Sequence, residues 1–106
     1  MLGMSDKEKR DADGELKTRE RVKKPRMWKV LLYNDDYTTM EFVVYLLQSV
    51  FRHSPAASSR IMLSVHKDGV GTAGTYTREI AETRMNQVLQ LARQEGHPLQ
   101  CTMEPE

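Results

Sequence analysis

A short apolar strand that runs directly into a polar cluster is the feature that most constrains the fold of this chain. Residues 28–33 read Trp-Lys-Val-Leu-Leu-Tyr and are rich in residues that favour strands. Asn34, Asp35 and Asp36 follow at once, and such short polar side chains commonly lead a chain out of a strand into a turn. The sequence therefore predicts three oxygen-bearing side chains at one strand end.

The next segment, residues 40–52, reads as an amphipathic helix. Its apolar residues recur at helical spacing and are Val43, Leu46, Leu47, Val50 and Phe51. Thr38 and Thr39 both suit the N-cap, and Thr38 with Glu41 matches a capping box. The polar cluster is therefore expected between a strand end and a helix start, at the edge of an apolar surface.

The rest of the chain predicts two more helices and two more strands. A second helix is expected from Pro55 to Gly69, and a third from its cap Thr77 to Gly96. Residues 70–76 and 99–103 read as the further strands. The order is strand, helix, helix, strand, helix, strand. It predicts a small α+β domain with a three-stranded antiparallel sheet packed against three helices.

Composition limits the class of protein. The chain has 106 residues and a formal net charge of +1, so it shows no signature of nucleic-acid binding. Its single cysteine, Cys101, excludes an intramolecular disulfide and fits a reducing compartment. No apolar run approaches the roughly 20 residues that a membrane span needs. We expect a soluble cytoplasmic protein without a membrane contact.

The first part of the chain differs from the rest. Residues 1–25 contain almost no large apolar side chains and mix both charge signs. Such a segment buries too little apolar surface to offset the entropy of ordering. We expect a disordered N-terminal arm over residues 1–25 and a core domain over residues 26–106.

Residues 69–74 read Gly-Val-Gly-Thr-Ala-Gly and match the G-x-G-x-x-G pattern of dinucleotide-binding proteins. That pattern binds pyrophosphate only between a strand and a helix N-terminus. Here a helix precedes the glycines, which then fall within an expected strand. We interpret them as a helix cap followed by a bulged strand, and reject nucleotide binding.

The polar cluster has three interpretations, namely a plain turn, a hard-cation site and a site for a protonated amine. The turn is the most general of them. A calcium loop would need further carboxylates at fixed spacing, which are absent. An ammonium group needs only acceptors, and His66, placed beside Met62 and Val65, can add one acceptor nitrogen to those of the cluster.

Enzymatic chemistry has little support in the sequence. No Ser–His–Asp or Cys–His arrangement is evident, and Cys101 has no obvious activating base. The histidines do not have metal-ligand spacing. The alternative that we keep is a small metal-dependent enzyme that uses Asp35, Asp36 and His66.

Residues 29–43 read Lys-Val-Leu-Leu-Tyr-Asn-Asp-Asp-Tyr-Thr-Thr-Met-Glu-Phe-Val, and this stretch resembles the signature of the ClpS adaptors of the bacterial N-end rule. The resemblance continues through residues 61–66, 81–83 and 96–102. It covers essentially all of residues 27–104, and the Asn-Asp-Asp-Tyr-Thr and Met-x-x-Val-His segments are highly specific.

The resemblance implies a monomeric adaptor, without a cofactor or enzymatic activity, that binds proteins whose first residue is Leu, Phe, Tyr or Trp. It would deliver them to the ClpA unfoldase of the ClpAP protease. The implied ligands of the substrate α-amino group are Asn34, Asp35, Asp36 and His66. The implied pocket for the first side chain consists of Leu32, Thr38, Met40, Val43, Met62, Val65 and Leu99. Glu79 and Arg84 stand where the family contacts the ClpA N-terminal domain.

Overall fold

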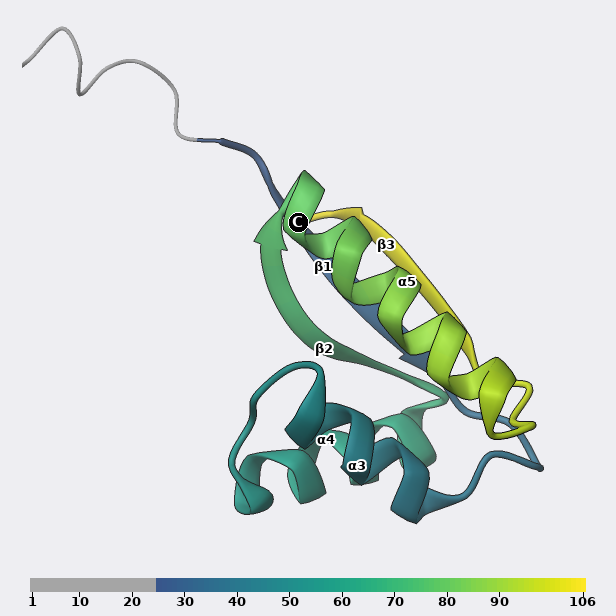
Figure 1. Ribbon diagram of the computed structural model, residues 1–106. Coiled ribbons are helices and arrows are strands. Elements are labelled where there is room, and N and C mark those ends of the chain that lie inside the picture. Colours follow the sequence, from purple (N-terminus) through teal and green to yellow (C-terminus); the bar gives the residue numbers. More distant parts are fainter. Residues whose placement is uncertain (1–24) are drawn as a thin grey trace, which may run out of the picture.

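The computed structural model describes residues 25–106, so the arm predicted over residues 1–25 lies, up to residue 24, outside the described residues. The elements in chain order are β1 (Met27–Tyr33), α3 (Met40–Ser49), α4 (Pro55–Asp68), β2 (Val70–Thr77), α5 (Arg78–Gln94) and β3 (Gln100–Pro105). The predicted α+β class and the predicted order of the elements are confirmed (Figure 1).

The sheet has the strand order β2-β1-β3, and both pairs are antiparallel. In this register Leu32 of β1 lies between Gly71 of β2 and Cys101 of β3. The β1–β2 register shifts between Val30 and Leu31, which marks a bulge in the ladder. Because β1 is the central strand, the segment that follows Tyr33 emerges between the two edge strands.

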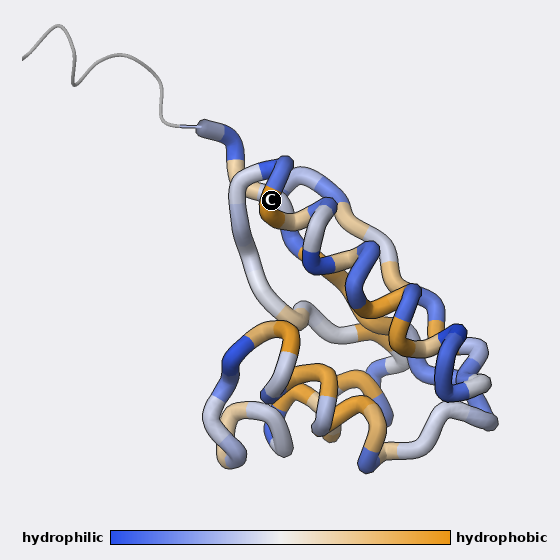
Figure 2. The backbone as a smooth tube through the Cα atoms, in the orientation of Figure 1, coloured by the Kyte–Doolittle hydropathy of each residue, from blue (hydrophilic) through white to orange (hydrophobic). Residues whose placement is uncertain are grey.

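The helices pack around one core against the sheet. α5 contacts β1, β3 and β2, α4 lies against β2, and α3 contacts α4 (Figure 1). Val30 and Leu32 are fully buried in this core together with residues from all three helices. Figure 2 shows the hydrophobic stretches gathered in α3 and β1 and alternating with hydrophilic ones along α5. None of the described helices is long and apolar enough to cross a membrane.

The ends of α3 differ from the prediction in two respects. The helix ends at Ser49, three residues before the predicted end at Arg52, and Arg52 has a left-handed φ of 62° that cannot continue a helix. At the N-terminal end of α3, the predicted capping box of Thr38 and Glu41 was wrong. Thr39 is the N-cap, because its side chain accepts a hydrogen bond from the Phe42 N–H, while the Thr38 hydroxyl is used elsewhere.

The glycines of residues 69–74 lie as predicted, at a helix end and in a strand. Gly69 caps α4 with a φ of 86°, a left-handed conformation that glycine adopts without a steric penalty. A Cβ at Gly71 would lie 2.7 Å from the Val65 side chain, so glycine there permits α4 to pack closely on β2. The two glycines thereby fix the C-terminal end of α4 beside the end of β1.

Candidate functional site

The loop after β1, residues 34–38, is organised around one carboxylate. Asp35 Oδ1 accepts hydrogen bonds from the backbone N–H groups of Tyr37 (2.8 Å) and Thr38 (2.7 Å). Its second oxygen, Oδ2, accepts one from the Thr38 hydroxyl at 2.7 Å. These bonds hold the loop in one conformation directly before the N-cap of α3.

The protonation of Asp35 follows from these contacts. Partial burial raises the pKa of this carboxyl, but the hydrogen bonds from Thr38 and Tyr37 favour its ionised form. The electrostatic effect of His97 acts in the same direction, and the net result is a pKa below the ordinary value of 3.8. Asp35 therefore carries its charge at neutral pH and keeps its acceptors engaged with the loop.

The end of β1 is joined to the end of α4 by the main chain. The Asn34 N–H donates to the Gly69 carbonyl at 2.9 Å, and the Gly69 N–H donates to the Val65 carbonyl at 2.9 Å. His66 lies in the last turn of α4 and is exposed, as are Asn34 and Asp36. Two segments that are far apart in sequence, both predicted to bind the amine, thus meet at one end of the sheet.

The predicted pocket residues divide into buried and accessible groups. Leu32, Val43, Val65 and Leu99 belong to one buried core cluster. Met62 is half-buried and packs against that cluster. Thr38 is also half-buried, while Met40 is 46% exposed at the start of α3. The accessible members are therefore Met40, Met62 and Thr38, while the other four belong to the buried core.

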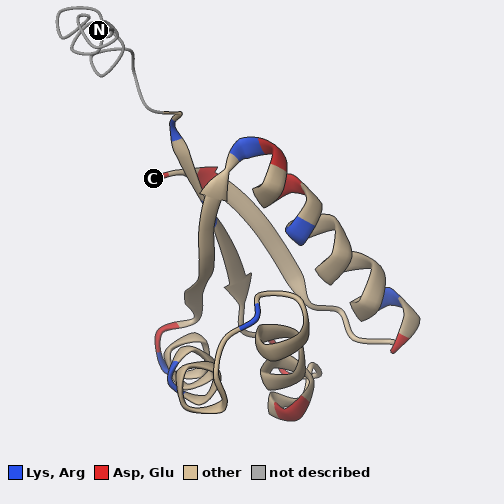
Figure 3. Cartoon of the chain, turned by 60° about the vertical axis from the view of Figure 1, so that its left-hand side comes forward, with Lys and Arg blue, Asp and Glu red and all other residues tan. Residues whose placement is uncertain are grey.

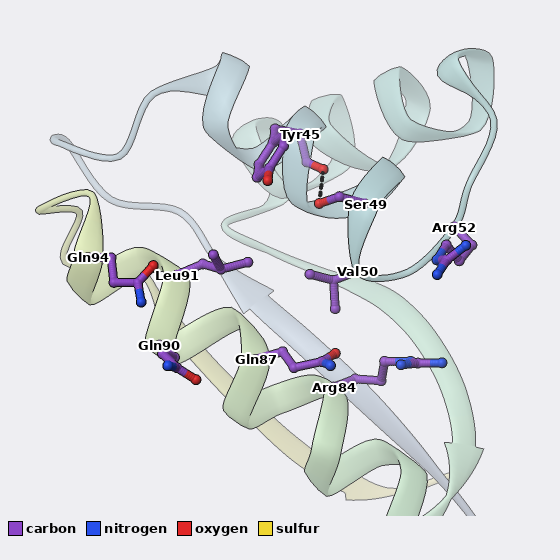
Figure 4. A pocket seen from close by; sticks show the side chains of 9 residues that line it. All are labelled: Tyr45, Ser49, Val50, Arg52, Arg84, Gln87, Gln90, Leu91 and Gln94. Atoms are coloured by element: carbon purple, nitrogen blue, oxygen red, sulfur yellow. Dashed lines mark hydrogen bonds between the residues drawn. The ribbon is translucent and has the colours of Figure 1, made fainter.

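Two hollows described in the structure lie elsewhere. One, of about 350 Å³, lies between α3 and α5 and is lined by Tyr45, Ser49, Val50, Arg52, Arg84, Gln87, Gln90, Leu91 and Gln94 (Figure 4). The other, of about 300 Å³, is lined by Phe42, Tyr45, Leu91 and Glu95. Neither is lined by any of the residues predicted to hold the first side chain of a substrate.

The two residues predicted to contact the unfoldase lie on α5, where the charged residues of the first turns gather (Figure 3). Glu79 is exposed in the first turn. Arg84 is half-buried, and its guanidinium lies 5.8 Å from the ring centroid of Tyr76. Its Nε is buried without a hydrogen-bond partner among residues 25–106. Arg84 therefore presents a charge at the edge of the hollow between α3 and α5.

The described residues do not favour the enzymatic alternative. Within residues 25–106 no group of three or more His, Cys, Asp or Glu residues is placed to hold a metal ion, so Asp35, Asp36 and His66 do not form such a group. Burial raises the pKa of the Cys101 thiol to about 12, which keeps it protonated and unreactive.

Sequence reasoning missed two features of this region, the internal use of Asp35 and the contact made by His97. It assigned Asp35 to the ligand alone, although the Asp-x-x-Thr spacing of Asp35 and Thr38 is also the pattern of a self-capped turn. It gave no role to His97, whose ring centroid lies 4.3 Å from that of Phe42. The available signal was its place after Gly96, where a helix was expected to end.

Comparison with known proteins shows which family the chain resembles. The profile of the family described as "ATP-dependent Clp protease adaptor protein ClpS" matches residues 23–102. An ATP-dependent Clp protease adapter protein ClpS from Maricaulis maris (strain MCS10) is 59% identical over 85% of this chain and 83% of its own length. A protein of the same description from Nitratidesulfovibrio vulgaris (strain DSM 19637 / Miyazaki F) is 56% identical over 87% of this chain and 92% of its own.

A solved structure has the same fold. The structure of Agrobacterium tumefaciens ClpS2 bound to L-phenylalaninamide superposes with a TM-score of 0.75 at 41% sequence identity. The match covers 78% of this chain and 100% of that one. The ligand of that relative is a free amine joined to an aromatic side chain.

Proposed function

The chain belongs to the ClpS family of ATP-dependent Clp protease adaptors, and on this premise we propose that it binds substrates through their first residue. The recognised group is the free α-amino group together with a bulky hydrophobic side chain, Leu, Phe, Tyr or Trp. The adaptor delivers these N-end rule substrates to the ClpA unfoldase of ClpAP for degradation. It acts by binding, without a cofactor and without catalysis of its own.

The α-amino group binds between the loop after β1 and the last turn of α4. A protonated amine is a donor only, so it requires acceptors, which Asn34, Asp36 and His66 can offer from the two joined segments. Asp35 belongs to the same site but acts mainly on the loop, because its oxygens already accept three hydrogen bonds. This division leaves Asp36 as the freer carboxylate for the amine.

The first side chain of the substrate rests on the apolar floor of Leu32, Val43, Val65 and Leu99, between Thr38, Met40 and Met62. Methionines adapt their shape readily, so Met40 and Met62 can admit both Leu and aromatic rings. Burying one such side chain contributes about 1.5–3 kcal/mol. A charge-assisted hydrogen bond contributes about as much, so a few terms, less the ordering cost, reach micromolar affinity.

The opposite side of the molecule serves delivery. We assign the contact with the ClpA N-terminal domain to the start of α5, where Glu79 is exposed and Arg84 borders the hollow between α3 and α5. Residues 26–106 form the binding core. The adaptor works as a monomer in the cytoplasm, where ATP is available to its ATP-dependent partner.

The observation that carries this proposal is the hydrogen bond from Asn34 N–H to the Gly69 carbonyl, since it holds the polar loop beside the turn of His66. The test is calorimetric binding of short peptides that differ only in their first residue. A Phe-starting peptide should bind at micromolar concentration, whereas its N-acetyl form, which has lost the charge and the donors, and a Gly-starting peptide should not. Equal binding of the free and acetylated peptides would refute the amine site. Divalent metal ions should change neither result, which separates the adaptor from the metal-dependent enzyme.

A further inference from the structure

His97 lies where the C-terminal end of α5 meets the start of α3. Gly96, with a left-handed φ of 75°, reverses the chain after α5. The N–H of His97 then donates to the Ala92 carbonyl at 2.8 Å. This bond ties the backbone of residue 97 to the last turn of α5, so the imidazole projects from a fixed point.

The ring of His97 packs on the first turn of α3. Its centroid lies 4.3 Å from that of Phe42, and the two planes are tilted by 31°. Phe42 is buried, and its N–H donates to the capping oxygen of Thr39. The stacked pair therefore fixes the helix start that immediately follows the loop of residues 34–38. Aromatic pairs of this kind contribute beyond the area that they bury.

The same imidazole also acts on the loop electrostatically. Partial burial opposes ionisation of Asp35, and the loop hydrogen bonds together with the Coulombic effect of His97 outweigh that opposition, so the pKa of Asp35 is lowered. The ionised carboxylate is the form that accepts the bonds from Tyr37 and Thr38. His97 thus reaches the loop by two routes, contact with Phe42 and attraction to Asp35.

We propose that His97 is a positioning residue for amine recognition, which holds the loop of residues 34–38 and the start of α3 in the geometry that the ligand needs. The proposal rests on the proposed function, because it assigns His97 to the same amine site. Its role is distinct from that of His66, which lies on α4 and offers an acceptor to the amine itself.

Two substitutions separate the routes. His97→Ala removes both the ring contact and the electrostatic effect on Asp35, while His97→Phe keeps a ring against Phe42 and removes the ring nitrogens, and with them the electrostatic effect. The matched control is His53→Ala. That histidine is also half-buried in a connection, but its Nε2 is paired with the Ala73 carbonyl, away from the loop.

The test uses the full chain and three measurements, the affinity for a Phe-starting peptide, the Asp35 carboxyl titration by NMR, and the melting temperature. His97→Ala should weaken peptide binding by up to about tenfold, the equivalent of a lost aromatic pair, and raise the pKa of Asp35. His97→Phe should raise that pKa equally and weaken binding less. His53→Ala should lower the melting temperature and leave both other quantities unchanged.

An Asp35 titration in His97→Ala that matches the parent protein overturns the proposal, and so does peptide binding that falls no more than in His53→Ala. If the parent protein fails to bind the Phe-starting peptide, the proposed function fails. In that case the Asp35 titration and the amide shifts of Tyr37 and Thr38, measured without ligand, still decide whether His97 positions the loop.

Discussion

Two regions of this small domain are built from different kinds of side chain. The loop of residues 34–38 is held by the short side chains of Asp35 and Thr38, and Asp35 alone accepts three hydrogen bonds from within the loop. The hollow between α3 and α5 is bordered by long ones, including Arg52, Arg84 and three glutamines (Figure 4). These hydrogen bonds fix the loop before any ligand binds, whereas the wall of the hollow consists largely of long side chains with many rotamers.

The difference fits the two tasks proposed for the molecule. A single amino group and one side chain offer few contacts, so each must be placed accurately and at little entropic cost on binding. A protein surface offers many contacts, and long side chains can adjust to it. The contrast predicts that substitutions at the loop change peptide affinity, and that substitutions along α5 change delivery.

The largest effect is expected from Asp36→Ala. Asp36 is exposed and is the freer carboxylate of the loop, so its loss removes a charge-assisted hydrogen bond to the amine. Such a bond contributes about 1.5–3 kcal/mol, so the affinity for a Phe-starting peptide should fall by roughly tenfold to a hundredfold. Calorimetry measures this. Glu82→Ala, which removes an exposed acid from α5, is the control and should bind as the parent does. A parental affinity in Asp36→Ala would break the assignment.

The next effect is expected from Arg84→Glu, in the wall of the hollow between α3 and α5. Reversing this charge should weaken binding of the ClpA N-terminal domain by roughly tenfold, because a partner group that is attracted by Arg84 would be repelled by Glu. Peptide affinity should stay at the parental value. Arg93→Glu, on the last turn of the same helix, is the matched control and should affect neither. A loss of peptide affinity in Arg84→Glu would show that the two regions do not act independently.

The same contrast explains how much of this molecule the sequence could predict. The strand before Asn34, the start of the second helix at Pro55, its cap at Gly69 and the order of the elements follow from local patterns, and the structure confirms them. The end of α3 was missed, because Val50 and Phe51 continue the apolar spacing although the helix stops at Ser49. Their burial comes from packing after the helix has ended, which periodicity does not distinguish.

At the site, residue types were easier to predict than their use. Asn34 and His66 were chosen for their chemistry, and the bond from Asn34 to Gly69 brings their segments together. The internal bonds of Asp35 and the stacking of His97 on Phe42 depend on loop geometry and on a contact between distant segments. The Asp-x-x-Thr spacing and the position after Gly96 are compatible with these contacts but do not require them, so only the three-dimensional structure assigns them.

A smaller effect, on stability, is expected from Asp35→Ala. The loss of its loop bonds should cost about 1–2 kcal/mol of the free energy of unfolding, as for a lost cap. Because the pKa of Asp35 is lowered on folding, its contribution is complete above the unfolded value of 3.8 and is lost as the pH falls through the folded pKa. The difference between variant and parent should therefore stay constant from neutral pH down towards the unfolded value of 3.8 and shrink only below it, as measured by urea denaturation. Asp35→Asn, which keeps an acceptor for the backbone, should lose less stability at neutral pH. A difference that does not vary with pH would contradict the role given to the carboxylate.

The smallest effect is expected from Met40→Ala, and it concerns specificity rather than affinity. Met40 is 46% exposed at the start of α3, where it can crowd a substrate side chain that branches at Cβ. Its truncation should raise the ratio of the affinity for Ile- and Val-starting peptides to that for Leu- and Phe-starting ones by a few-fold. Such a change is expected for a methylene-scale difference worth about 1 kcal/mol. Leu63→Ala, at a residue of α4 that is 48% exposed, is the matched control and should leave the ratio unchanged. Because the ratio compares two ligands on one variant, a general loosening of the fold cancels from it. An unchanged ratio in Met40→Ala would place the selection against branched residues in the buried floor, where Val43 and Val65 lie.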